Sequence, residues 1–282
     1  MGTTSLAELL AICNDRLPKS FYVNQLVAYS FIKDKTAKPW EPFSTMLILP
    51  YGDHGSLSDV LECRPVSQKK KPLKLSPIVR LTLCLDVVSA VMDCQTCGVV
   101  HGGVCTENFW VFDVKEKDRW AQHKLGKKLL LNAPGGSAVV ARLANFDHSK
   151  IEDMYTADHI YERVGNEYDP PEGQVRGHQP ISFEKLKAAD GFALGILMMV
   201  ICELPVPHVK SVCSALMRNS NWGRKSRVFR DIMPHSWNLV AYELMLSAAL
   251  WLTETNQELR PRSMNIIRQT LELALAVQSR VG

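Results

Sequence analysis

The sequence predicts an α+β fold, in which a small strand-bearing part precedes a larger, mainly helical part. Segments 24–34 and 43–52 are rich in β-branched and aromatic residues, which is typical of strands. Long apolar segments at 76–94, 183–204 and 262–280 indicate helices. The 282-residue chain is 46% hydrophobic, which allows one large folded unit or two lobes with a shared core.

Two short helices are predicted beside these first strands. In segment 4–16, Leu6, Leu9, Leu10 and Ile12 recur at helical spacing behind a Thr/Ser cap. Segment 56–63 reads as another short helix. The lysine run at 67–74 is expected to be a solvated loop, because adjacent like charges repel one another.

Helix 76–94 is expected to form the core of the larger part. A broad apolar face is formed by Leu81, Leu85, Val88 and Met92. Strands are predicted after it, at 108–114, 128–132 and 138–146. A charged insertion, 114–127, separates the first two of these strands.

Charge and hydropathy exclude two classes of partner. A net charge of +4 is too mild to predict direct nucleic-acid binding. The longest apolar run lies within 191–207 and is too short, and too limited by prolines, to span a bilayer. Neither a nucleic acid nor a membrane is therefore expected as a partner.

Eight cysteines lie scattered in apolar stretches, which is typical of reduced thiols in an intracellular compartment. The pair Cys94 and Cys97, with His101 nearby, also permits a zinc hypothesis. No second pair of ligands follows at a suitable spacing, so the sequence favours no metal site.

Several motifs of the chain resemble those of protein kinases, and they occur in the order found in that family. The segment HGGVCTEN, 101–108, resembles the catalytic loop His-x-Asp-x-x-x-x-Asn, with His101 and Asn108 retained and Gly103 in place of the aspartate. Segment 47–61 resembles the hinge and the first helix of the large lobe, with Leu49 as gatekeeper. The remaining likenesses place Asn145, Phe146 and Asp147 at Asp-Phe-Gly, Glu172 at Ala-Pro-Glu, Asp190 in the central helix and Arg260 at the late arginine.

This resemblance implies a protein-kinase-like bilobal fold with a reduced small lobe, 1–52, and a mainly helical large lobe, 53–282. The Gly-rich loop and the strand lysine that should precede the first helix are missing from the sequence. Either these elements lie outside this sequence or the small lobe is degenerate. Glu8 stands where a helix glutamate usually pairs with that lysine, although an exposed helix charge is the simpler role for it.

A narrower likeness points to spindle-checkpoint kinases of the Bub type. Their catalytic loop begins His-Gly-Asp, and here it reads His101, Gly102, Gly103. Segments 11–34, 51–61, 148–154 and 229–246 also resemble that family, as does a long insert before the Asp-Phe-Gly position. With Gly103 in place of the catalytic aspartate, the chain most resembles the Bub-like pseudokinases of kinetoplastid kinetochores. They imply a nuclear protein of the kinetochore whose partners are other kinetochore or mitotic proteins.

The substitutions predict that phosphoryl transfer is lost. This reaction needs an acid near the acceptor hydroxyl, carboxylate-held magnesium and a lysine on the phosphates. Gly103 has no side chain, Cys105 replaces the loop lysine, and Asn145 is a neutral and weaker ligand for a hard dication. Asn108 alone cannot hold magnesium, although Asp147 could shift toward the metal position. No catalytic residue, ATP, magnesium or other cofactor is therefore expected.

Trp110 bears on nucleotide binding itself. The resemblance places a modest aliphatic side chain at this position, against the adenine ring. An indole is large enough to fill that space together with Leu49, and its burial is favourable. A blocked nucleotide pocket is the prediction, and the alternative is that Trp110 turns outward and packs elsewhere.

The retained residues have structural rather than chemical roles in the resemblance. His101 is expected to stack on Phe146, Asp190 to accept backbone N–H groups of the loop at 101–103, and Glu172 to pair with Arg260. A buried carboxylate needs such partners. The skeleton is thus kept while the reactive groups are lost.

Three functions remain open from the sequence. The first is a catalytically inactive pseudokinase that acts as a protein–protein interaction scaffold in chromosome segregation. The second is an atypical kinase or residual nucleotide-binding kinase of the checkpoint type, and the third is a nucleotide-binding switch without catalysis. The insertion 114–127 and the basic stretch 218–230 are candidate partner surfaces, and a solvated loop is the simpler interpretation of the second.

Overall fold

A computed structural model shows the architecture of the protein. The structure describes the following residues: 12, 16–17, 20–33, 43–64, 72–114, 139–155, 167–171, 181–204, 233–234, 236–254 and 256–280.

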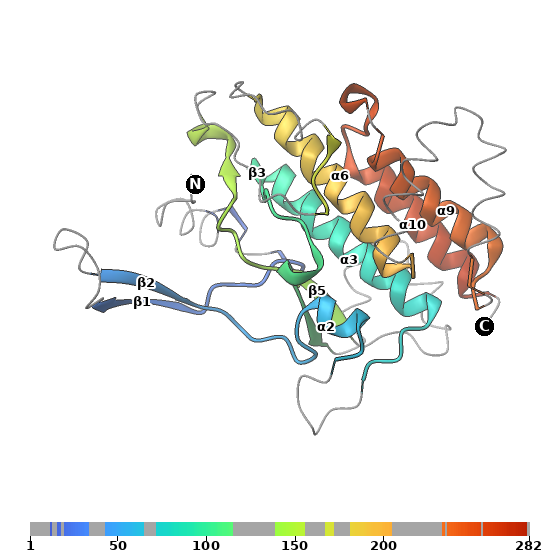
Figure 1. Ribbon diagram of the computed structural model, residues 1–282, viewed down its shortest axis with the longest axis horizontal. Coiled ribbons are helices and arrows are strands. Elements are labelled where there is room, and N and C mark those ends of the chain that lie inside the picture. Colours follow the sequence, from blue (N-terminus) through green and yellow to red (C-terminus); the bar gives the residue numbers. More distant parts are fainter. Residues whose placement is uncertain are drawn as a thin grey trace.

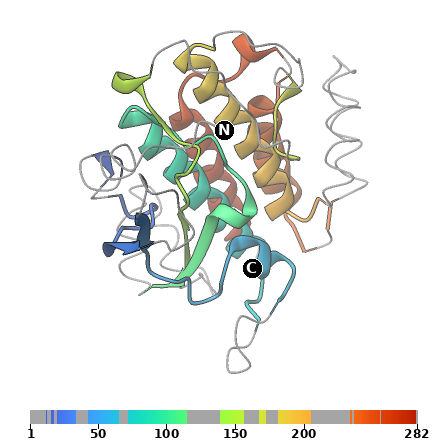
Figure 2. The same ribbon diagram turned by 60° about the vertical axis from the view of Figure 1, so that its left-hand side comes forward.

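The described part is a mixed α+β structure, about half helical, with small antiparallel sheets of two strands each. Four long helices, α3, α6, α9 and α10, lie side by side, and the β1–β2 hairpin extends away from them (Figure 1). The view in Figure 2 brings this hairpin forward and shows the helices stacked behind it. The α+β prediction is confirmed, and the bilobal arrangement stays a prediction.

The helix α3, Pro77–Thr96, forms the centre of the core. Its N-cap Ser76 accepts a hydrogen bond from the Val79 N–H, and Pro77 occupies the first turn, where no N–H is needed. The expected apolar face is present, but residues 78–91 are buried on every side of the helix. Most of these buried residues are apolar, and a helix that is hydrophobic on nearly every side lies inside a protein rather than on its surface.

Three further helices pack around α3, and two of them contact it directly. Both α6, Phe183–Ile201, and α10, Met264–Gln278, contact α3, and α9, Leu239–Leu252, packs on α6 and α10. Their apolar side chains form one continuous cluster with those of α3. The predictions of helices at 76–94, 183–204 and 262–280 are confirmed.

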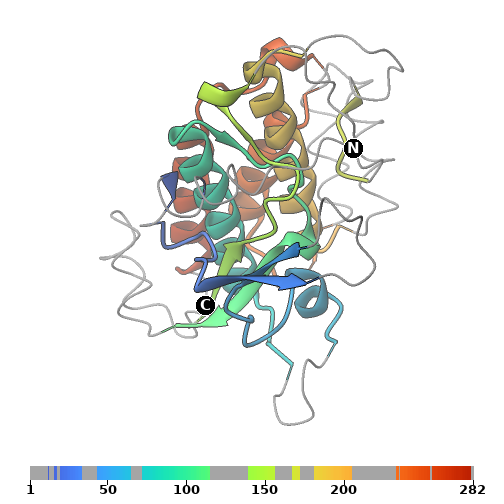
Figure 3. The same cartoon turned by 90° about the vertical axis from the view of Figure 1, so that its left-hand side faces the viewer.

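Within the described residues, each strand pairs with one other strand. β1, Ala28–Lys33, pairs antiparallel with β2, Phe43–Ile48, as the sequence predicts for 24–34 and 43–52. β4, Phe109–Asp113, pairs with β5, Val139–Leu143, and this ribbon packs its β5 strand on α3. Figure 3 shows the two ribbons on the same side of the helices, next to α2.

The remaining elements are short. The predicted helix at 56–63 is α2, Leu57–Leu61, which is held by a capping box between Ser56 and Asp59. β3, Val99–Val100, pairs with β6, Lys150–Ile151. Three 3₁₀ turns complete the order: η2, Thr106–Asn108, η3, Glu152–Met154, and η5, Gln257–Leu259.

Some predictions fall mainly or wholly outside the described residues. They comprise most of the first helix (4–16) with Glu8, most of the lysine run (67–74), the insertion 114–127, the strand 128–132, Glu172 and the basic stretch 218–230.

Candidate functional site

The segment 101–108 follows the short strand β3 and ends in the 3₁₀ turn η2, directly before β4. The helix α3 ends at Thr96, and β3 lies between it and His101. β3 pairs with β6, which follows the segment 144–149 in sequence. This pairing brings the loop at 101–108 next to Asn145 and Phe146.

Asp190, in the middle of α6, anchors this loop. One carboxylate oxygen accepts a hydrogen bond from the His101 N–H at 2.7 Å, and the other accepts one from the Gly102 N–H at 2.9 Å. This expected contact is present, and it satisfies two backbone donors that have no strand partner. Burial raises the pKa of Asp190 to about 7, while the two N–H groups act in the opposite direction.

The imidazole of His101 links the loop to the next strand. Its Nε2 lies 3.0 Å from the Ala144 carbonyl, and its Nδ1 accepts a hydrogen bond from the Gly103 N–H at 3.2 Å. These partners require a neutral ring with its proton on Nε2. Burial lowers the pKa of His101 to about 4. The expected contact with Phe146 is also present, edge to face, with 4.9 Å between ring centroids.

Gly102 and Gly103 have different reasons to lack a side chain. Gly102 has φ +73°, and a Cβ there would lie 2.6 Å from the His148 carbonyl oxygen. At Gly103 the nearest atom to a Cβ would be the Asn108 side-chain nitrogen, at 3.3 Å. The backbone therefore requires glycine at 102, whereas at 103 it leaves room for a small side chain.

Asn108 and Asn145 bind each other. The Asn145 amide nitrogen donates to the Asn108 side-chain oxygen at 3.1 Å, and the Asn108 nitrogen donates to the Gly103 carbonyl at 2.7 Å. Asn145 adopts φ 61°, a left-handed conformation that asparagine tolerates. With Gly103 also lacking a side chain, these three positions supply no carboxylate, so the residues present do not fit a magnesium ion.

Asp147 lies two residues after Asn145 in the sequence. Its side chain is exposed in the turn before β6, whereas the neighbouring Phe146 is buried.

Trp110 lies on β4 and is half-buried. Its ring meets that of Tyr51 edge to face, with 4.5 Å between centroids. Its backbone bridges to Ser56, at the start of α2. Leu49, also half-buried, lies two residues before Tyr51. Trp110 thus packs beneath the segment that the sequence assigns to a hinge, and the nucleotide-blocking role of Trp110 and Leu49 stays a prediction.

Arg260 is buried and binds backbone carbonyls. Its guanidinium donates to the Glu254 carbonyl at 2.7 Å and to the Ala188 carbonyl at 3.2 Å, and it lies over the Phe192 ring. The predicted partner Glu172 lies outside the described residues.

The cysteine pair next to this site does not form a metal centre with His101. Cys94 is fully buried inside α3, and burial raises its pKa well above the usual range, which disfavours a thiolate ligand. Within the described ranges, no three side chains of His, Cys, Asp or Glu come close enough together to hold a metal ion. Six described cysteines are free thiols: Cys63, Cys84, Cys94, Cys97, Cys105 and Cys202.

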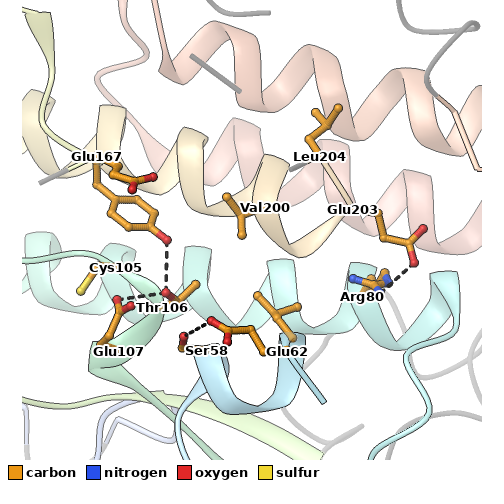
Figure 4. Close-up of a pocket in the computed structure, with 12 residues that line it drawn as sticks. Ser58, Glu62, Arg80, Cys105, Thr106, Glu107, Glu167, Val200, Glu203 and Leu204 are labelled. Atoms are coloured by element: carbon orange, nitrogen blue, oxygen red, sulfur yellow. Dashed lines mark hydrogen bonds and ion pairs between the residues drawn. The ribbon is translucent and has the colours of Figure 1, made fainter. Parts of the chain in front are cut away.

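A cavity of about 690 Å³ opens beside the 101–108 loop (Figure 4). Its walls come from α2, the η2 turn, residues 167–168, the start of α3 and the end of α6. Tyr168 is buried there, 3.2 Å from the Thr106 hydroxyl, and burial raises its pKa to about 12. The sequence did not predict this cavity, because its walls are distant in the chain.

Two buried charges in α3 were also missed. Arg80 donates to the Ile201 carbonyl at 2.5 Å and pairs with Glu203 at 2.8 Å, which ties the start of α3 to the end of α6. Asp86 accepts the Ala141 N–H at 3.0 Å and holds β5 on α3. The available signal was an ionisable side chain in an otherwise apolar helix, because such a group is rarely buried without a partner.

Comparison with protein-family models finds no match to this chain, and comparison with curated protein sequences finds none either. None of the helices in the described ranges has the length and hydropathy needed to cross a bilayer.

Proposed function

We propose that the chain is a catalytically inactive pseudokinase that serves as a protein–protein interaction scaffold in the kinetochore and chromosome segregation machinery. The observation that carries the first half of this proposal is the bonded pair of amides, Asn108 and Asn145, beside Gly103. In protein kinases a carboxylate at the position of Asn145 holds the metal, and another at the position of Gly103 receives the acceptor proton, whereas Asn108 is the residue that kinases also have. Here the Asn145 amide donates to Asn108 and residue 103 has no side chain, so both carboxylates are missing from these positions.

Room for a side chain at Gly103 adds to this argument. The loop backbone there would accept a small side chain with a shift of a few tenths of an ångström in Asn108. The fold therefore does not force the loss of the acid. A protein that no longer transfers phosphate has no need of that acid, which fits an inactive scaffold.

The packing around the loop supports retention of a binding fold. Asp190 and His101 still hold the loop through four hydrogen bonds, although Gly103 stands in place of the catalytic acid. Buried polar groups of this kind destabilise a protein when a partner is lost, so they are kept where the loop conformation matters. A scaffold needs that conformation for its surface rather than for chemistry.

The kinetochore assignment depends on sequence likeness alone. Segments 51–61 and 148–154, together with the His101-Gly102-Gly103 start of the loop, resemble the Bub type. Isolation of the full-length protein from dividing cells, with identification of co-purified proteins, tests this part. Recovery of kinetochore proteins supports it, and recovery of none would overturn it.

Thermal unfolding with nucleotide tests the inactive state. We expect no change in Tm at millimolar ATP, with or without Mg²⁺ or Mn²⁺, because a ligand that binds the folded state must raise Tm. An active protein kinase domain in the same assay provides the positive control. A metal-dependent rise in Tm together with labelled phosphate on a substrate would establish the atypical kinase, and a rise without transfer would establish the switch.

A further inference from the structure

Two buried thiols meet where α3 and α6 pack against each other. The Sγ atoms of Cys84 and Cys202 lie 3.7 Å apart, and both residues are fully buried. The Cys84 thiol donates toward the Met198 carbonyl at 3.9 Å, so the Cys202 thiol is the donor in the contact between the sulfur atoms. Because the two cysteines are 118 positions apart in the sequence, the packing of the helices brings them together.

Arg80 holds Cys202 against α3. Its guanidinium binds the residues on either side of that cysteine, because it donates to the Ile201 carbonyl at 2.5 Å and pairs with Glu203 at 2.8 Å. Figure 4 shows the Arg80 and Glu203 side chains turned toward each other. Cys84 follows Arg80 by four residues, so both side chains leave the same face of α3. The end of α6 is thus attached to α3 one helical turn from the two sulfur atoms.

The two sulfur atoms need only a small movement to form a covalent bond. A disulfide places its sulfur atoms about 2.0 Å apart, so the pair has to approach by about 1.7 Å. Rotation of each side chain about its Cα–Cβ bond supplies part of this movement. Cys202 is also the C-cap of α6, where the helix ends, and its backbone can shift more readily than that of a residue inside the helix.

We propose that Cys84 and Cys202 form a reversible disulfide when the protein is exposed to hydrogen peroxide, and that this bond fixes the end of α6 to α3. The Cys202 thiolate attacks one peroxide oxygen, the O–O bond breaks, and the hydroxide that leaves takes up the thiol proton to give water. The Cys84 sulfur then attacks the sulfenic sulfur of residue 202, and the S–O bond breaks with loss of a second water. The two thiols lose two protons and two electrons, which reduce one peroxide to two waters.

Burial slows this reaction while the protein stays closed. Burial and the contact with Cys84 raise the pKa of Cys202 well above its usual range, although the Arg80 charge acts in the opposite direction, so little thiolate forms. Oxidation therefore proceeds when the last turn of α6 opens and admits peroxide. Cys63 is exposed and provides a comparison within the same chain. We expect peroxide to oxidise Cys63 faster than the buried pair.

Mass spectrometry of the peroxide-treated protein tests the proposal. Free thiols are blocked with N-ethylmaleimide as the chain is unfolded, and trypsin digestion follows without a reducing agent. We expect the peptides that contain Cys84 and Cys202 to be joined, and dithiothreitol to separate them. Because the bond closes a loop that spans 118 positions, the Tm of the oxidised protein should exceed that of the reduced protein by about 5–10 °C.

A matched pair of variants distinguishes this bond from other thiol chemistry. Cys84→Ala should form no link to Cys202 and should show no rise in Tm after peroxide treatment. Cys94→Ala removes another fully buried thiol of α3 and should form the link as the wild-type chain does. The peptides of the wild-type chain report the bond directly, so the test remains decisive if a variant does not fold.

Three results would overturn the proposal. The first is absence of the joined peptides after complete oxidation of Cys63, including in urea just below the unfolding transition, where local opening is frequent. The second is a bond that leaves Tm unchanged, and the third is a Cys202 link that forms equally in Cys84→Ala. The assay contains neither nucleotide nor protein partner, so its outcome is independent of the proposed scaffold function.

Discussion

At the scale of single residues, His101 shows why the loop conformation persists without a catalytic acid. Its ring is buried, and both of its nitrogens have backbone partners, so the side chain links the loop to residue 144 by hydrogen bonds. Protonation of the ring would break the hydrogen bond from the Gly103 N–H, because Nδ1 would then become a donor. Protonation of His101 at low pH therefore destabilises the folded state.

This effect predicts that the stability difference between the wild-type chain and a His101→Phe variant depends on pH. Histidine titrates near 6.5 when unfolded and at about 4 here, so its contribution is fully present above pH 6.5 and is lost as the pH falls toward 4. From pH 7 to pH 5 the wild-type advantage in free energy of unfolding should shrink by about 2 kcal/mol. Urea unfolding at a series of pH values measures this difference.

Asp190 does not obscure that measurement. Its raised pKa has the opposite sign, because the stability it contributes is present at low pH and is lost as the pH rises through about 7. The carboxyl group is present in both proteins, so its contribution cancels in the comparison. A wild-type advantage that stays constant from pH 7 to pH 5 would contradict the role assigned to His101.

Contacts around His101 could be predicted for residue types that require particular partners when they are buried. A buried aspartate needs donors, and the resemblance to protein kinases implied that Asp190 lies near the loop and accepts its backbone N–H groups, as it does. The bond between Asn108 and Asn145 was not predicted. Asparagine is stable exposed or buried, with many partners, so its type indicates no particular contact.

At the scale of elements, the crossing of α6 and α9 depends on Gly195. A Cβ at this position would lie 2.7 Å from the Ala249 carbonyl oxygen and 2.7 Å from the Thr253 methyl group. Contacts this short involve backbone, which cannot rotate out of the way. The two helices therefore approach as closely as they do because residue 195 has no side chain.

A matched pair of substitutions on α6 tests this crossing. Gly195→Ala should lower the free energy of unfolding by about 1–3 kcal/mol, since α9 has to move. At Gly191, one turn earlier, the nearest atom to a Cβ is the mobile Met264 methyl group, at 3.1 Å. Gly191→Ala should be neutral or stabilising by up to about 1 kcal/mol, because alanine favours the helix. Equal destabilisation by both changes, measured by chemical unfolding, would contradict this account.

The elements themselves followed from the sequence more readily than their contacts. The helices α3, α6 and α10 carry long apolar runs behind serine caps, and these local signals do not depend on the rest of the fold. The pairing of β3 with β6 could not be foreseen, because each strand has two residues and no periodicity. The Gly195 contact requires knowledge of the neighbouring helix, which lies about fifty residues later in the sequence.

At the scale of the whole molecule, one apolar cluster joins the helices to the β4–β5 ribbon. It runs from Val23 through Val111 and Leu85 to Leu275, all of them buried. The β1–β2 hairpin differs, since its described side chains are largely exposed, including Tyr29 and Ile48. Strands with little buried surface contribute little to stability and open locally.

This difference predicts two levels of protection in native-state hydrogen exchange. Amides in α3, α6 and β5 should exchange only through global unfolding, because these elements share one core, whereas amides in β1 and β2 should exchange faster through local opening. Leu85→Ala removes a fully buried side chain from the middle of α3 and should cost about 2–5 kcal/mol. In this variant the protection of amides from exchange should fall by the same amount in α3, α6 and β5, and it should not change in the hairpin. A loss confined to α3, or an equal loss in β1, would show that the core is divided differently from what the packing indicates.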